Sequence, residues 1–385
     1  MRLLHTADWH LGRLLHNLSL LEDQRAVLDQ LLEVVDRERI DAVLIAGDVY
    51  DRSVPPAAAV ALLDAVLHAL CETRGVAVVM ISGNHDGARR LGFGSRQLRQ
   101  SGLHILSTLD AIADPVTLAA GGVEVDIYGI PYADPEQVRS HFGVDVRDFD
   151  AAHRYLLERI DAQRDPDRRA VLMSHCFVAG GSASDSERPL SLGGAESVAW
   201  EPMRGFDYVA LGHLHGPQYR GEAHIRYSGS LLKYSFSEAP HTKGVTLVDV
   251  DATGAVDIKP VALAPVRDVR VLEGELDDVI AGAALDPAPD DYLLVRLTDR
   301  YAILDPMGKL RAVYPNVLHL EKPGMLAPAG EAPRARRHGG LDALALFGDF
   351  FQQVSGEALD DDQKAAVEGL IGRLEREERD EEGVT

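Results

Sequence analysis

Five apolar segments that lack polar alternation constrain the fold of this chain most strongly. Consecutive hydrophobic side chains are typical of strands that are buried on both faces of a sheet. The first three of these segments are separated by residues 23–39 and 55–70, which carry apolar side chains at helical spacing. A strand–helix–strand order of this kind predicts an α/β fold in which helices cover the sheets. The five predicted strands span residues 2–8, 41–48, 75–83, 169–175 and 207–215.

Each of these predicted strands ends in side chains that can bind a metal ion or move a proton. The carboxyl ends of strands in α/β sheets form the ligand crevice, so we expect these side chains to meet at one rim. A lone histidine at a strand end is more often structural, but five coincidences at the same topological position favour a site. The side chains expected at the rim are Asp8, His10, Asp48, Asn84, His85, His175, His213 and His215.

The chemistry of these side chains indicates which metals they would hold. Carboxylate, amide and imidazole groups without a thiolate suit manganese, iron or zinc. Seven plausible ligands are too many for one ion and fit two ions that share a bridging carboxylate. Asp48 follows a glycine and a buried strand, and we expect it to be that bridge.

Composition argues against several other classes of protein. The 385 residues are too many for one compact core and predict two or three domains. We expect no membrane segment, because no apolar run reaches about 18 residues, and the lack of a signal peptide favours the cytoplasm. Two cysteines support neither a disulfide framework nor a thiolate zinc site. The net charge of -22 argues against a DNA-binding protein without excluding one, because residues 356–385 hold eleven acidic against four basic side chains.

The strand-end motifs resemble those of the calcineurin-like metallophosphoesterases. They read DWH at 8–10, GDVYDR at 47–52, GNHD at 83–86, SHCF at 174–177 and GHLH at 212–215. Longer stretches such as LHTADWHLGR and RYSGSLLKYSFSE are similar to the SbcCD nuclease-subunit branch, over nearly all of residues 1–255. The resemblance implies a β-sandwich flanked by helices, two Mn2+ ions and metal-dependent hydrolysis of DNA phosphodiester bonds. The implied activities are 3'-to-5' exonuclease action on double-stranded ends and endonuclease action on single strands and hairpins, in DNA repair, replication and recombination.

The same resemblance implies a role for each matched residue. His85 and Asp86 would form a catalytic pair beside the metals, in which Asp86 steadies the imidazole. Asp51 and Arg52 would support the ligands from behind. One ion would be held by Asp8, His10, Asp48 and His215, and the other by Asp48, Asn84, His175 and His213. Lys233 and Lys243 lie in a stretch that resembles a family loop and are possible DNA contacts. Arg89 and Arg90 directly follow the GNHD loop, where they either contact DNA phosphates or belong to a solvated loop.

The remaining segments predict the domain organisation. Residues 1–260 would form the nuclease domain, and residues 265–324 a small α/β domain, which by resemblance is a capping domain. The Pro- and Gly-rich stretch 325–340 is typical of a linker. Two amphipathic helices at 341–380 cannot bury their apolar faces alone. The resemblance implies that they dock the SbcC ATPase subunit, in a heterotetramer that contains a homodimer of this chain.

Two alternative functions stay open at this point. A phosphodiesterase or phosphatase of the same superfamily could use the metals on a non-DNA substrate, although such an enzyme needs neither a capping domain nor docking helices. A scaffold subunit could hold the metals for structural reasons only, although His85 and Asp86 would then be idle. The sequence also leaves open whether His85 donates a proton or only binds the phosphate.

Overall fold

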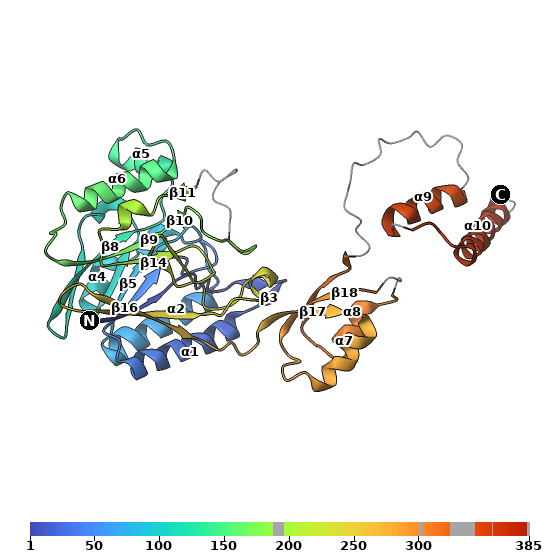
Figure 1. Cartoon of the computed structure of the whole chain (residues 1–385), viewed down its shortest axis with the longest axis horizontal. Helices are drawn as coiled ribbons and strands as arrows, with labels where there is room; N and C mark the ends of the chain where they lie inside the picture. Colours follow the sequence, from blue (N-terminus) through green and yellow to red (C-terminus); the bar gives the residue numbers. More distant parts are fainter. Residues whose placement is uncertain (188–195, 300–302, 324–342, 356, 383–385) are drawn as a thin grey trace. The chain divides into compact units, whose positions relative to one another are not determined.

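The apolar segments at the start of the chain form two six-stranded sheets (Figure 1). The computed structural model describes residues 1–187, 196–299, 303–323, 343–355 and 357–382, and the chain divides into two units, Met1–Val269 and Arg270–Thr385. The first sheet contains, in spatial order, β16 (Val256–Ala262), β15 (Gly244–Val250), β1 (Arg2–Thr6), β4 (Ala42–Ala46), β5 (Ala77–Ile81) and β6 (Leu103–Leu106). The second sheet contains β13 (Gln218–Arg220), β14 (Glu222–Tyr227), β12 (Tyr208–Gly212), β9 (Arg169–His175), β8 (Val123–Ile130) and β7 (Val116–Ala120).

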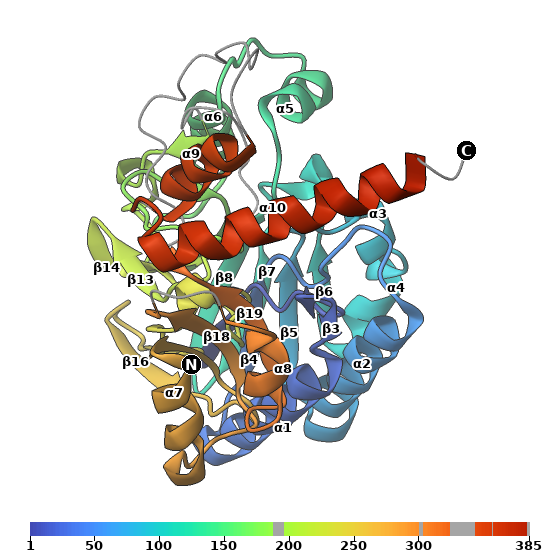
Figure 2. The same cartoon turned by 90° about the vertical axis from the view of Figure 1, so that its right-hand side faces the viewer.

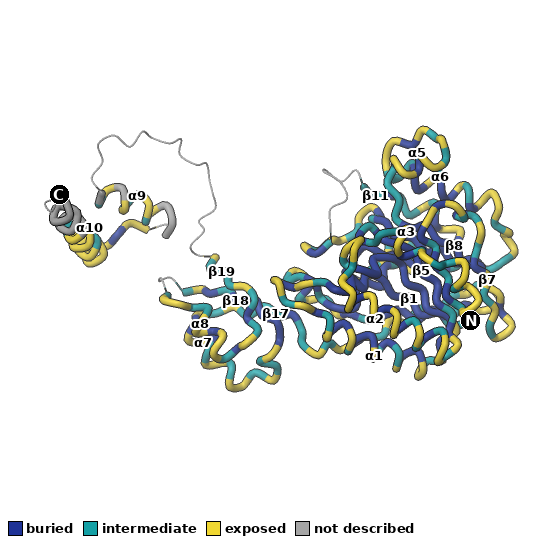
Figure 3. Tube along the Cα trace, turned by 180° about the vertical axis from the view of Figure 1, so that it is seen from behind, coloured by how far each residue is buried: buried dark blue, intermediate teal, exposed yellow. Residues whose placement is uncertain are grey.

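The two sheets share one apolar core. Leu44 of β4 and Val79 of β5 belong to the same buried cluster as Ile127 of β8, Val171 of β9 and Ala210 of β12. None of these five side chains has exposed surface, and Figure 3 shows the strands as the most buried part of the first unit. The predicted α/β sandwich of sheets is therefore confirmed.

Helices connect the parallel strands and cover the sandwich. α1 (Leu21–Glu38) and α2 (Ala57–His68) link β1, β4 and β5 and lie beside the first sheet (Figure 2). In the second sheet, Leu156 of α6 (Phe149–Asp161) packs in one buried cluster with Leu172 of β9. The shorter elements of this unit are β2 (Leu14–Leu15), β3 (Leu18–Ser19), α3 (Ala88–Leu91), α4 (Ser95–Leu98), α5 (Pro135–Phe142), β10 (Phe177–Val178) and β11 (Ser197–Val198).

The second unit has its own small sheet and apolar cluster. β17 (Val269–Gly274), β18 (Tyr292–Leu297) and β19 (Val317–Glu321) form three strands, with α7 (Leu276–Gly282) and α8 (Pro306–Arg311) between them in sequence. Leu276, Val295 and Leu310 are buried together. These elements lie within residues 265–324, whereas the predicted linker at 325–340 falls outside the described residues.

The last part of the chain contains two helices, α9 (Ala343–Ser355) and α10 (Asp361–Glu382). The Asp360 carboxylate accepts a hydrogen bond from the Gln363 backbone N–H at 2.8 Å and caps α10. On α9, Phe347 and Phe351 stack with ring centroids 6.4 Å apart, and Phe350 is 59% exposed. Among the described residues, no helix combines the length and the apolar character needed to cross a membrane.

Two buried imidazoles affect how stability depends on pH. The Nε2 atom of His153 on α6 lies 2.9 Å from the Ser174 hydroxyl, and the Nδ1 atom of His5 on β1 lies 2.8 Å from the Tyr208 hydroxyl. Burial lowers the pKa of His153 from 6.5 to about 4 and the pKa of His5 from 6.5 to about 3. Both rings are therefore neutral in the folded chain at pH values at which the unfolded chain already binds their protons.

We predict that His5 and His153 contribute a loss in the free energy of unfolding of the first unit when the pH falls from 7 to 5. The unfolded chain takes up the two protons below a pKa of about 6.5, whereas the folded chain takes them up only near the lowered values, so stability falls with pH in between. His153→Gln keeps a hydrogen-bonding group near Ser174 and cannot titrate, and it should remove part of this loss. Urea unfolding followed by tryptophan fluorescence measures the first unit, because both tryptophans, Trp9 and Trp200, lie in it.

Replacement of an exposed histidine, His141→Gln, provides the control and should leave the pH dependence as in the wild type. A His153→Gln chain that loses as much stability between pH 7 and pH 5 as the wild type would contradict the prediction.

Candidate metal centre

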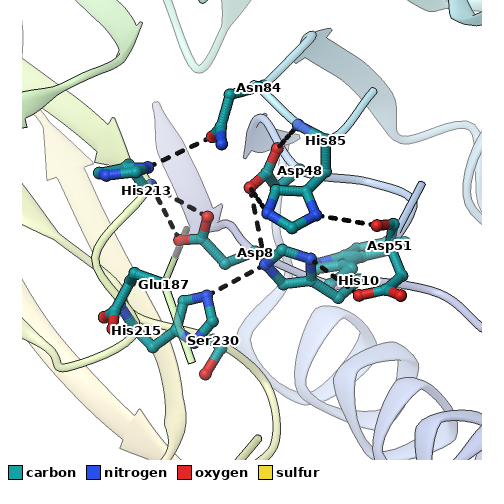
Figure 4. A network of polar contacts seen from close by, with 12 residues as sticks. Asp8, His10, Asp48, Asp51, Asn84, His85, Glu187, His213, His215 and Ser230 are labelled. Carbon is teal, nitrogen blue, oxygen red and sulfur yellow. Dashed lines mark hydrogen bonds and ion pairs between the residues drawn. The ribbon is translucent and has the colours of Figure 1, made fainter. Parts of the chain in front are cut away.

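The carboxyl ends of β1, β4, β5, β9 and β12 converge on one buried cluster (Figure 4). Strands from both sheets contribute, because β1, β4 and β5 belong to the first sheet and β9 and β12 to the second. The structure brings together all of the side chains expected at the rim, and ten of the residues in the cluster are labelled in Figure 4. The expected ligands are Asp8 and His10 after β1, Asp48 after β4, Asn84 after β5, His175 at the end of β9, and His213 and His215 after β12.

Several of these residues have unusual backbone conformations. The φ angles of Asp8, His10, Asp48 and His213 are 53°, 44°, 48° and 109°, in the left-handed region that side chains other than glycine rarely adopt. Such a conformation costs about 1–3 kcal/mol per residue and persists only where the surroundings impose it. The surroundings include backbone hydrogen bonds between two strand-end loops, from Asp8 N to Gly47 O at 3.1 Å and from His10 N to Asp48 O at 2.9 Å.

Glycines make room for the cluster. A Cβ atom on Gly83 would lie 2.1 Å from Asp48 Oδ1, and a Cβ atom on Gly47 would lie 2.3 Å from His175 Nδ1. On Gly212 it would lie 1.9 Å from the backbone oxygen of Ala46, where β12 approaches β4 across the sandwich. The first residue of each of these three motifs must therefore be glycine, because any larger residue would clash with the neighbouring loop or strand. The sequence did not reveal this steric reason.

One group of ligand atoms lies around Asp8, His10 and His215, whose ligand atoms are all within 4.8 Å of one another. The Nε2 atoms of His10 and His215 face each other at 3.0 Å, and His10 Nε2 lies 3.6 Å from Asp48 Oδ2. The Asp8 carboxylate also accepts the backbone N–H of His213 at 3.0 Å, so this carboxylate joins the two sheets.

A second group lies on the other side of Asp48. His175 Nε2 lies 3.5 Å from Asp48 Oδ2 and 3.0 Å from Asn84 Oδ1, and the Asn84 oxygen lies 3.3 Å from His213 Nδ1. The Asp48 Oδ2 atom therefore lies within 3.6 Å of an imidazole nitrogen of each group, and its role as a bridge stays a prediction.

The electrostatics of the cluster fit a cation. Burial raises the pKa of the Asp8 carboxyl to about 7. Burial alone would lower the pKa of His175, but the Asp48 carboxylate raises it to about 9. The imidazole nitrogens of His10 and His175 lie 3.5–3.6 Å from the Asp48 carboxylate. His10 Nδ1 and Asn84 Nδ2 have no hydrogen-bond partner among the described residues. A set of oxygen and nitrogen donors with this charge suits divalent ions of the manganese, iron or zinc type.

The prediction that Asp86 steadies the His85 ring is wrong. The Asp86 carboxylate accepts three backbone hydrogen bonds, from Val49, Tyr50 and Gly83, at 2.9–3.1 Å. The His85 ring is instead held by the backbone oxygen of Asp51, 2.8 Å from Nδ1. Consecutive side chains point in different directions, so Asp86 fixes the loops that carry the ligands rather than the imidazole.

The predicted supporting role of Arg52 is also not seen. Arg52 is exposed, whereas Arg13 donates a hydrogen bond to Asp51 Oδ1 at 3.1 Å and another to the backbone oxygen of Ser186 at 2.9 Å. The Arg13 guanidinium also lies over the Tyr234 ring, 5.3 Å from its centroid. Arg13 closes the stretch LHTADWHLGR, on which the family resemblance rests, so the sequence contained a signal for it, although it was not singled out as a site residue.

Of the four predicted DNA contacts, the structure leaves Arg89 and Arg90 exposed on α3. Lys233 forms an ion pair with Asp268 at 2.9 Å and donates to Ala239 O at 2.7 Å. Lys243 is buried and pairs with Glu238, so a direct contact between Lys243 and DNA is ruled out by its position. The DNA-contact prediction for both lysines came from the resemblance of their stretch to a family loop, and the resemblance did not indicate their acidic partners Asp268 and Glu238.

Comparisons with known proteins agree with this geometry. Residues 1–217 match the family model of the calcineurin-like phosphoesterases, and residues 265–355 match the Type 5 capsule protein repressor C-terminal domain. The D subunit of the nuclease SbcCD from Staphylococcus epidermidis is 38% identical over 321 residues, which cover 83% of this chain and 85% of that protein.

Two solved structures that match this chain share much less sequence with it. A dimetal phosphatase from Danio rerio is 14% identical, covers 69% of this chain and 97% of its own, and has a TM-score of 0.39. A hypothetical protein from Thermus thermophilus is 16% identical, covers 69% of this chain and 100% of its own, and has a TM-score of 0.37.

We predict that Gly83→Ala weakens metal binding at this cluster by about tenfold or more, because the new Cβ would displace the Asp48 carboxylate. The overpacked loop should also lose about 1–3 kcal/mol of stability. Equilibrium dialysis with Mn2+ measures the bound metal. Gly282→Ala is the matched control, because a Cβ atom there meets nothing within 4 Å, and it should bind metal as the wild type does. Unchanged Mn2+ binding by Gly83→Ala would contradict the steric argument.

Proposed function

The chain belongs to the calcineurin-like phosphoesterase family, in the branch of the SbcCD nuclease D subunits, and we propose that it hydrolyses DNA phosphodiester bonds at the strand-end cluster. The observation that carries the proposal is the convergence of oxygen and nitrogen donors from both sheets on the buried Asp48. The proposed substrates are double-stranded ends, cleaved 3'-to-5', and single strands and hairpins, cleaved internally. The proposed setting is DNA repair, replication and recombination in the cytoplasm.

Two divalent ions, most simply Mn2+, are the proposed cofactor. Asp8, His10 and His215 would hold one ion, and Asn84, His175 and His213 the other, with Asp48 shared between them. When bound, the ions supply positive charge for the phosphodiester and make water more acidic. Asp51 and Arg13 support the two loops that carry His10 and His85.

His85 is the proposed catalytic side chain. A backbone carbonyl only accepts hydrogen bonds, so the ring donates Nδ1–H to Asp51 O at 2.8 Å, and its Nε2 atom is the one available to the substrate. In its cationic form the ring could donate the Nε2 proton to the leaving oxygen. The carbonyl of Asp51 keeps the ring oriented for this transfer in both charge states. Arg89 and Arg90, which are exposed and follow Asp86 closely in the chain, are the proposed contacts to DNA phosphates.

We predict that His85→Ala lowers the turnover of a hairpin DNA by about 100- to 10,000-fold while the number of bound Mn2+ ions stays the same. Rates of hairpin cleavage and metal analysis of both proteins test this. Loss of a metal ion in the variant would show that His85 is a ligand instead.

The choice of substrate is tested with the purified chain and Mn2+ on three compounds. Hairpin DNA, bis-p-nitrophenyl phosphate and a phosphopeptide separate a nuclease from a phosphodiesterase or phosphatase of the same superfamily. Cleavage of the phosphopeptide without cleavage of the DNA would overturn the proposed function.

The proposed partner is an ATPase subunit of the SbcC kind, docked on α9 and α10. Exposed apolar side chains on these helices support it, since Phe350 is 59% and Leu370 is 52% exposed. We also propose a homodimer of this chain within the heterotetramer. A cavity of about 530 Å³ beside α2, lined by Val60, Leu63 and the 85% exposed Phe93, offers an apolar surface for the second copy.

We predict that the double substitution Phe350→Ser and Leu370→Ser abolishes co-purification with a co-expressed ATPase subunit, because it removes apolar surface from both helices. Hydrolysis of bis-p-nitrophenyl phosphate should be unchanged. Gln352→Ser, which alters an exposed polar residue of α9, is the control and should still co-purify. Retained binding of the double variant would refute docking through these helices.

A further inference from the structure

Three polar atoms of the buried His215, all except the ring Nε2 atom that faces His10, contact residues outside the predicted ligand set. Its backbone N–H donates to Glu187 Oε1 at 2.8 Å, and its backbone oxygen accepts from Lys243 Nζ at 2.7 Å. The ring Nδ1 atom lies 2.6 Å from the hydroxyl of Ser186. Ser186 in turn contacts Glu238 Oε1, which itself lies 3.4 Å from the ring. Ser186 and His215 are 29 positions apart in the chain, so the sequence gives no hint of the contact.

Lys243 fixes the charge state of Glu238. The ammonium group has three protons and three strong acceptors, namely Glu238 Oε2, the His215 backbone oxygen and the Ser230 hydroxyl at 2.9 Å. Both partners are almost fully buried, with Glu238 0% and Lys243 5% exposed. A buried ammonium group in direct contact with a carboxyl group favours the ionised carboxylate. Glu238 is thus a carboxylate, which can only accept hydrogen bonds.

The direction of each hydrogen bond follows from this charge. Because Glu238 only accepts, the Ser186 hydroxyl donates its single proton to Glu238 Oε1. The Ser184 hydroxyl oxygen lies 3.1 Å from that of Ser186. It donates its own proton to Glu187 Oε2 at 2.6 Å and therefore not to Ser186. With its proton used, Ser186 can only accept from the ring, so His215 carries its proton on Nδ1. The Nε2 atom is then unprotonated and faces His10 Nε2 at 3.0 Å, in the tautomer that a metal requires.

We propose that Ser186, held by the Glu238–Lys243 ion pair, is a positioning residue that fixes the tautomer and orientation of His215 for metal binding. This inference rests on the proposed function, because metal binding at the strand-end cluster is part of that function. It also replaces the predicted DNA-contact role of Lys243 with a structural one behind the site. Outer partners that orient a metal-binding histidine typically contribute about 10- to 100-fold to affinity.

Ser186→Ala is the variant that tests the proposal. It removes the hydroxyl without leaving Lys243 unpaired, whereas Glu238→Gln would leave a buried ammonium without its carboxylate and could prevent folding. Isothermal titration of the chelator-treated protein should give a Mn2+ affinity at one site about 10- to 100-fold weaker than in the wild type. Ser186→Thr, which restores a hydroxyl at this position, should recover most of the lost affinity.

Ser237→Ala is the matched control. The Ser237 hydroxyl accepts a hydrogen bond from the Asp185 backbone N–H at 2.9 Å, so it tethers the same loop without touching His215. The control should keep the wild-type affinity. Equal losses in Ser186→Ala and Ser237→Ala, or no loss in Ser186→Ala, would overturn the proposal.

A second measurement does not depend on metal at all. In chelator-treated protein labelled with ¹⁵N-histidine, the His215 signal, assigned by its absence in His215→Gln, should have the Nδ1–H pattern in the wild type and lose it in Ser186→Ala. An Nε2–H pattern in the wild type would overturn the proposal even if the metal binds. If the wild type shows the Nδ1–H pattern but binds no Mn2+, the proposed function fails. The hydrogen bonds from His215 through Ser186 to Glu238 would then still be supported.

Discussion

The buried carboxylate of Asp48 is the interaction on which the rest of the site depends. It accepts the backbone N–H of His85 at 2.8 Å and lies 3.5–4.0 Å from the rings of His10, His85 and His175. A lone buried carboxylate is strongly unfavourable, so it must be matched by positive charge. Loops from both sheets bring imidazole rings to the Asp48 carboxylate. A divalent cation held there would supply the remaining positive charge.

Convergence of this kind requires a rigid frame, which the neighbouring polar network supplies. Asp86 ties together the loops after β4 and β5 through three backbone N–H groups. Gln24 of α1 donates to the backbone oxygens of Trp9 and His10 at 3.1 and 2.8 Å and holds the loop after β1. These hydrogen bonds offset the cost of the left-handed conformations at Asp8, His10 and Asp48, since a strained loop otherwise relaxes. The surrounding chain thereby holds the ligand side chains in place.

The sequence predicted the general features well and the partners of individual side chains poorly. Runs of buried apolar residues identified β4, β5, β9 and β12, because hydrophobic periodicity is a local property. Asp86 and Lys243 were assigned wrong contacts, although both lie in or near recognised motifs. Their true partners, such as Tyr50 and Glu238, depend on the direction in which each side chain leaves its loop, and a motif does not specify that direction.

The sequence by itself determined the class of fold and the set of donors at the strand ends, because strand order and residue type are written along the chain. Only the tertiary structure decided why Gly47, Gly83 and Gly212 must be glycines. A Cβ atom at these positions would clash with atoms from other parts of the two sheets and their loops. It also decided which nitrogen of His215 faces the site, through Ser186, Glu238 and Lys243. A tautomer and a steric limit both arise from contacts between segments far apart in the chain, and only folding brings those segments together.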